Sequence, residues 1–80
     1  MSVQMSDAEL RERLLQDSEE YRRLAAEHQH FDHVLEDFAN KHYLSEEEQL
    51  QEKTMKKKKL MLKDQMYAMV QKKRRELEPE

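Results

Sequence analysis

The stretch NKHYLSEEE, residues 40–48, decides the fold that the sequence predicts. Within it, Ser45 is followed three residues later by Glu48. This is the capping-box pattern, in which the serine hydroxyl accepts the glutamate amide proton while the glutamate carboxylate accepts the serine amide proton. A helix is therefore predicted over about 46–77, because no helix breaker intervenes before Pro79, which ends it.

One amphipathic pattern runs through the residues before this stretch. The sequence MSDAEL repeats the capping device at Ser6, so a first helix is predicted over about 7–42. Steps of four and three residues from Leu10 reach apolar side chains at seven of ten positions. Asp17 occupies one of these positions and Ser18 can cap a new helix, so the pattern allows a kink near Ser18.

A second apolar stripe, stepped in the same way from Met55, ends close to Leu77. The connection, at about 43–45, is so short that the helices must run antiparallel, and folding about residue 44 pairs positions whose numbers sum to about 88. The predicted fold class is all-α, a coiled-coil-like antiparallel two-helix hairpin that forms a single domain over residues 1–80. The side chains predicted to pack are Tyr21, Leu24, Phe31, Leu35, Phe38, Leu50, Met55, Leu62, Met66 and Met69.

The composition points the same way. The 80 residues are 36% hydrophobic and 41% charged, which is enough for one small domain only. Glycine and cysteine are absent, so tight β-turns, disulfides and thiol chemistry have no support. The first residues lack a secretory pattern and no apolar run approaches the ~20 residues that span a bilayer, so we expect a cytoplasmic chain without a membrane span.

The charge pattern divides the chain in two. Residues 53–75 hold ten lysines and arginines and one acidic residue, Asp64, whereas residues 7–41 hold ten acidic and five basic residues. Antiparallel packing would set an acidic helix against a basic one, which favours this pairing. Asp64 is predicted to pair with a neighbouring lysine or with Arg22 or Arg23 of the first helix.

The basic segment has a second interpretation. The favoured interpretation is that the basic side chains are exposed to solvent and are neutralised by the acidic helix. Aromatic stacking residues beyond Tyr67 and a recognisable nucleic-acid fold are missing. The alternative is binding of nucleic acid or another anionic surface through the basic face of the second helix. The residues that would contact the polyanion are Lys56, Lys57, Lys58, Lys59, Lys72, Lys73, Arg74 and Arg75.

Metal or catalytic chemistry finds little support in the residues. In EHQHFDH, the pairs His28 with Asp32 and His30 with His33 lie one helical turn apart, but two ligands from one helix are too few for a metal site. Glycine-rich loops and a nucleophile beside a base are also missing. We therefore expect no cofactor, no metal ligands, no catalytic residues and no enzymatic activity.

Several apolar residues of the second helix lie off its packing stripe: Leu60, Met61, Tyr67 and Val70. One partner helix cannot cover side chains that are spread so far around the axis. We therefore expect a structural or protein-interaction module that self-associates as a dimer or tetramer, with an unidentified protein partner as a further option.

The segments EHQHFDHVLEDF and KKKKLMLKDQMYAMV resemble the YdcH-like family of small bacterial proteins. The likeness extends over about 21–70, and Met66 and Phe31 differ from the usual family residues but remain apolar. The matching positions are His28, Phe31, Asp32, Lys59, Leu60, Leu62, Lys63, Asp64, Met66 and Tyr67. The resemblance implies a bacterial helical hairpin or coiled coil of uncharacterised function, and it implies no particular activity.

Overall fold

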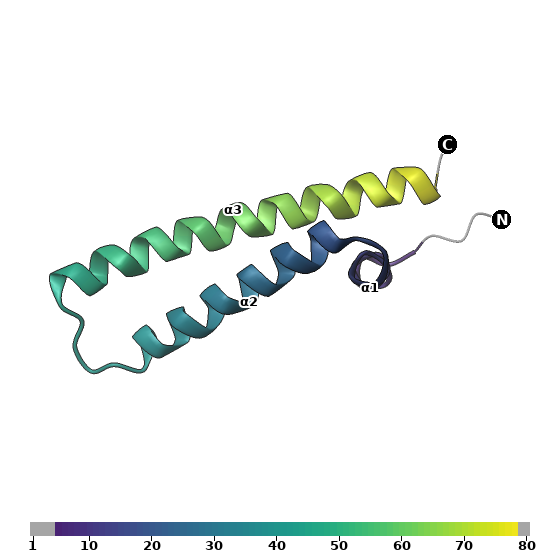
Figure 1. Cartoon of the computed structure of the whole chain (residues 1–80). Coiled ribbons are helices and arrows are strands. Elements are labelled where there is room, and N and C mark those ends of the chain that lie inside the picture. Colours follow the sequence, from purple (N-terminus) through teal and green to yellow (C-terminus); the bar gives the residue numbers. More distant parts are fainter. Residues whose placement is uncertain (1–4, 79–80) are drawn as a thin grey trace.

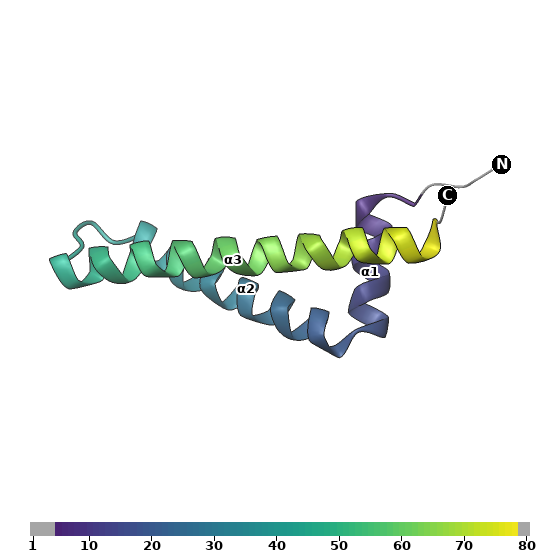
Figure 2. The same cartoon turned by 90° about the horizontal axis from the view of Figure 1, so that it is seen from above.

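The computed structural model describes residues 5–78, and within that range the chain folds into three helices: α1, Asp7–Asp17, α2, Glu19–Ala39, and α3, Glu46–Leu77. Helices α2 and α3 lie side by side and antiparallel, and α1 crosses the far end of this pair (Figures 1 and 2). The molecule is a rod with extents of 56 × 21 × 18 Å. The all-α prediction is confirmed, but the prediction of a two-helix hairpin is wrong.

The predicted continuous first helix is broken at Ser18, where the sequence allows a kink. Ser18 has extended backbone angles, φ −119° and ψ 114°, and its hydroxyl accepts the Tyr21 amide proton at 3.1 Å. The Arg22 guanidinium donates to the carbonyls of Leu15 at 2.8 Å and Gln16 at 2.9 Å. These bonds satisfy backbone groups that a helix end leaves without partners, so the break is stable.

Burial supplies the reason for the break. Two long helices lying side by side would leave some apolar side chains partly exposed, whereas a crossing helix covers them. As a result, Leu10 and Tyr21 are only 0% and 1% exposed. The cluster that α1 forms with α2 and α3 is Leu10, Leu14, Tyr21 and Val70, with Met5, Met66 and Met69 packed against it. Away from this junction, the buried apolar side chains of the described residues are Phe38 and Leu62.

The connection between α2 and α3 covers residues 40–45 and is longer than predicted, because α2 ends at Ala39. Its far end carries the predicted capping box: Ser45 accepts the Glu48 amide at 3.1 Å, and Glu48 accepts the Ser45 amide at 3.2 Å. Lys41 pairs with Glu48 and lies 5.3 Å from the centre of the Phe38 ring. The turn is therefore tied to both helices that it joins.

The two hairpin helices differ in length, since α2 has 21 residues and α3 has 32. An ion pair joins Asp32 of α2 to Lys59 of α3, and their numbers sum to 91. Lys41 and Glu48, which pair at the connection, have numbers that sum to 89. Both sums lie within one helical turn of the predicted value of about 88. Helix α1 crosses the part of α3 that extends beyond α2 (Figure 2).

Replacement of Leu62 by alanine tests the packing of α3 on α2. Leu62 is buried, so Leu62→Ala is expected to lower the free energy of unfolding by about 2 to 5 kcal/mol in a urea titration followed by circular dichroism. Leu60, which is 59% exposed on the same helix, is the matched control, and Leu60→Ala should change stability by less than about 0.5 kcal/mol. Equal effects of the two substitutions would show that the orientation of α3 is wrong.

Candidate functional site

The ten side chains predicted to pack lie at different depths. Tyr21, Phe38 and Leu62 are buried. Leu50 is 66% exposed and does not pack against the rest of residues 5–78, because it lies five residues before Met55 and so points about 140° away from the stripe. The remaining members of the set are half-buried: Leu24, Phe31, Leu35, Met55, Met66 and Met69.

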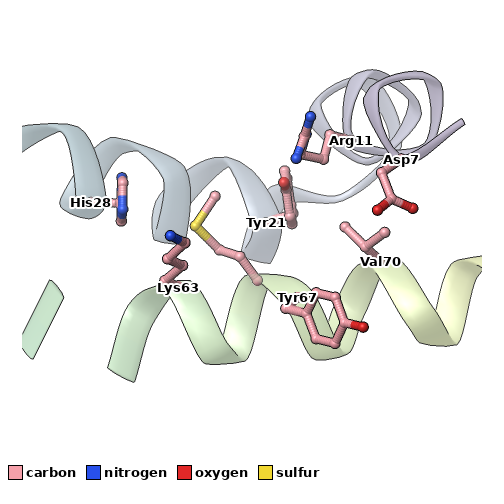
Figure 3. Close-up of a pocket in the computed structure, with 8 residues that line it drawn as sticks. Asp7, Arg11, Tyr21, His28, Lys63, Tyr67 and Val70 are labelled. Atoms are coloured by element: carbon pink, nitrogen blue, oxygen red, sulfur yellow. The ribbon is translucent and has the colours of Figure 1, made fainter. Parts of the chain in front are cut away.

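A pocket of about 270 Å³ opens where the three helices meet (Figure 3). Burial raises the pKa of Tyr21, and nearby Arg11 offsets part of this effect, so the phenol is neutral at neutral pH and can donate a hydrogen bond. Helix α1 contributes two charged residues to the wall, and the other helices contribute mainly apolar and cationic groups. The lining residues are Asp7, Arg11, Tyr21, His28, Lys63, Met66, Tyr67 and Val70.

Arg74 fastens the start of α1 to the end of α3. Its guanidinium pairs with Asp7, donates to the Met5 carbonyl at 2.8 Å and pairs with Glu78 at 3.2 Å. The Met5 amide donates in turn to the Glu78 carboxylate. The sequence analysis assigned Arg74 to polyanion contact, whereas the structure places it in this clamp.

The eight residues predicted for polyanion contact do not form one patch. Residues 56–59 are consecutive on a helix, so their side chains point in four directions about 100° apart. Lys59 pairs with Asp32 and lowers the pKa of that carboxyl, mainly through the hydrogen bond between them. Lys56 lies 3.6 Å from Glu52 of its own helix.

The other five members of that basic set have no carboxylate within 4.0 Å among residues 5–78: Lys57, Lys58, Lys72, Lys73 and Arg75. Within the same range, Asp32 with Lys59 is the one direct ion pair between α2 and α3. The acidic and basic helices therefore lie together as expected, but few of their charges meet.

Asp64 does not pair with Arg22 or Arg23, contrary to the prediction, and it has no cation within 4.0 Å among the described residues. Arg22 instead caps the end of α1. The neighbours of Asp64 at three and four residues along α3 are all uncharged: Leu60, Met61, Tyr67 and Ala68. We call these four residues together with Asp64 the outer patch of α3.

The outer patch is open to solvent. Leu60, Met61 and Tyr67 are 59%, 61% and 62% exposed. Val70, which the sequence analysis grouped with these three, is buried at 4% because α1 packs over it. The surface that remains uncovered is therefore an apolar ring around Asp64, within the basic part of α3 at residues 53–75.

The histidine cluster does not converge. His28 lies 3.8 Å from Asp32, and His30 lies beside Phe31 with ring centres 5.6 Å apart. Across residues 5–78, no group of three or more histidine, cysteine or acidic side chains is arranged to hold a metal ion. In the same part of the chain, none of the helices is long and apolar enough to cross a bilayer.

The hairpin with its crossing helix places the chain among small all-α proteins. Comparison of its sequence with family models then identifies the family. Residues 21–70 match the family described as "Protein of unknown function (DUF465)". The chain belongs to this family, the YdcH-like small proteins of unknown function, which confirms the resemblance. No curated protein and no solved structure gave a match.

The matched span begins at Tyr21 and ends at Val70, so it covers the hairpin and the whole outer patch. Helix α1 and Arg74 lie outside it. Sequence reasoning missed this crossing arrangement, because the contact between Asp7 and Arg74 joins residues 67 positions apart and leaves no local signal. The signals in the sequence were local to the break: Asp17, an acidic residue on an apolar stripe, and Ser18, which can cap a new helix.

Loss of the Arg74 guanidinium is expected to loosen α1 without melting the hairpin. Arg74→Gln removes the bonds to Asp7 and Met5, so amides of α1 should exchange with solvent several-fold faster while amides in the middle of α3 keep their rate. The measurement is hydrogen exchange read by mass spectrometry. Arg75→Gln is the control, because Arg75 has no ion pair among the described residues, and equal acceleration in both variants would contradict the clamp.

Proposed function

We propose that the chain is a non-catalytic protein-interaction module that self-associates through the outer patch of α3. The observation that carries the proposal is the exposure of Leu60, Met61 and Tyr67 as neighbours on one helix face. Exposed apolar patches with polar residues around them often mark interaction sites. Aromatic residues and methionine are also the types enriched at such interfaces.

The position of the patch supports the proposal. Asp64, at the centre of the patch, lies two residues from buried Leu62, which places it about 200° around the axis from the side that faces α2. A partner can therefore reach the patch without displacing either of the other helices. The non-catalytic part of the proposal is supported by the lining of the pocket in Figure 3, which contains no serine, threonine or cysteine.

Sedimentation equilibrium of the wild-type chain tests self-association directly. We expect a mass above that of the monomer. The double variant Leu60→Gln with Met61→Gln should associate at least about tenfold more weakly, because glutamine leaves the net charge unchanged and removes the apolar contact. Tyr43→Gln is the matched control, since Tyr43 is 80% exposed in the connection and lies off the patch. A wild-type chain that is monomeric at every concentration would refute the proposal.

Binding of a polyanion is a second candidate. The observation in its favour is the set of five cations in α3 that have no carboxylate within 4.0 Å among residues 5–78, since such cations can neutralise phosphates. The same cations point in several directions around α3, so a nucleic acid would meet only part of the set at once.

Retention on immobilised duplex DNA and single-stranded RNA tests this second candidate. If the cations bind phosphates, retention should fall steeply as salt rises, and Lys57→Gln with Lys58→Gln should reduce both retention and its salt dependence. Lys59→Gln is the internal comparison, because Lys59 is already paired with Asp32. Absence of retention at low salt would remove the candidate.

A further inference from the structure

The charges along α3 are arranged so that the helix complements its own reversed copy. Its first turn carries three acidic residues, Glu46, Glu47 and Glu48, and its last turn carries Arg74 and Arg75. Two copies laid antiparallel would place the acidic start of each helix near the basic end of the other. Two copies laid parallel would place like charges together along the whole contact, which is repulsive.

From this pattern we infer that the partner of the outer patch is a second copy of the chain, paired antiparallel about a two-fold axis that passes between Leu60 and Met61. The inference rests on the proposed function and specifies its partner and geometry. Leu60 of each copy faces Met61 of the other, so the two exposed side chains cover each other. Because the interface is isologous, every contact occurs twice.

Asp64 finds its partner in this arrangement. Asp64 lies three residues after Met61, and Lys57 lies three residues before Leu60, so reversal about the axis sets each Asp64 against Lys57 of the partner subunit. Both side chains are exposed and neither has an ion-pair partner within residues 5–78. The surrounding apolar residues partly exclude water on pairing, which strengthens the attraction.

The ends of the interface follow the same register. Glu46 of one copy faces Arg75 of the other, at positions that are equally far from the axis. Both helices take part over their whole length of 32 residues, which is about 48 Å. Helices α1 and α2 both lie on one side of α3 (Figure 1). Asp64 points away from that side, and Met61 and Tyr67 lie at its borders, in the walls of the grooves between α3 and these helices. The pairing therefore leaves the fold of each subunit unchanged.

Disulfide trapping reads the register, since the chain has no native cysteine. We expect Lys57→Cys and Asp64→Cys chains, mixed and mildly oxidised, to give mainly the mixed disulfide dimer, identified by its mass. Each variant alone should cross-link at least about tenfold less. In a dimer of one variant, the two equivalent cysteines are offset by seven residues along the helix axis, which is about 10 Å, and a disulfide needs Cα atoms within roughly 7 Å.

Charge reversal tests the ion pair itself by sedimentation. Lys57→Asp alone and Asp64→Lys alone should each weaken the dimer about tenfold by placing like charges together, and the double variant should recover to within about threefold of the wild type. Asp37→Lys, an exposed change on α2, is the control and should leave the dimer intact. Circular dichroism of each variant checks that the helices are kept.

The outcomes separate this inference from the proposed function. Self-disulfides of Lys57→Cys at the rate of the mixed pair would indicate parallel helices and overturn the inference while self-association stands. A dimer that neither forms the mixed disulfide nor responds to charge reversal would place the contact elsewhere, again against the inference alone. A strictly monomeric chain would remove both.

Discussion

Packing of α2 on a single side of α3 is the constraint on which the other features depend. A helix of 21 residues covers one stripe of a helix of 32, so the end of α3 and the whole of its opposite side stay open. Helix α1 crosses this end of α3 (Figure 2) and covers Val70. The opposite side has no cover from residues 5–78, and it is there that the outer patch lies.

Because α1 crosses the hairpin, the chain loses some backbone hydrogen bonds of a continuous helix and buries its apolar side chains more deeply. An unbroken first helix would keep the backbone hydrogen bonds that are interrupted near Ser18, but it would contact α3 along one seam only. The crossing helix encloses Tyr21 between three helices, and this residue is far more buried than Leu24, one turn further along α2. Ser18 and Arg22 supply replacement partners for the interrupted backbone groups, so the exchange is favourable.

The parts of the fold that the sequence predicts are those governed by near neighbours. The capping box at Ser45 involves residues three positions apart, and it is present. Whether Ser18 bends or breaks the helix depends on Val70, more than fifty residues away, so the sequence marks the place but not the outcome. Asp64 was assigned a partner from composition, whereas helix spacing, which surrounds it with apolar residues, was the better guide.

The clamp between Asp7 and Arg74 has a consequence for the order in which the chain folds. Lys41 and Glu48 close a loop of seven residues, whereas Asp7 and Arg74 close one of 67. The entropy lost on closure grows with loop length, so contacts near the connection form at least cost and those at the rod's other end follow. We therefore expect the contacts between α2 and α3 to form first near the connection and then progressively along the rod. The most deeply buried cluster, where α1 crosses the other helices, forms last during folding.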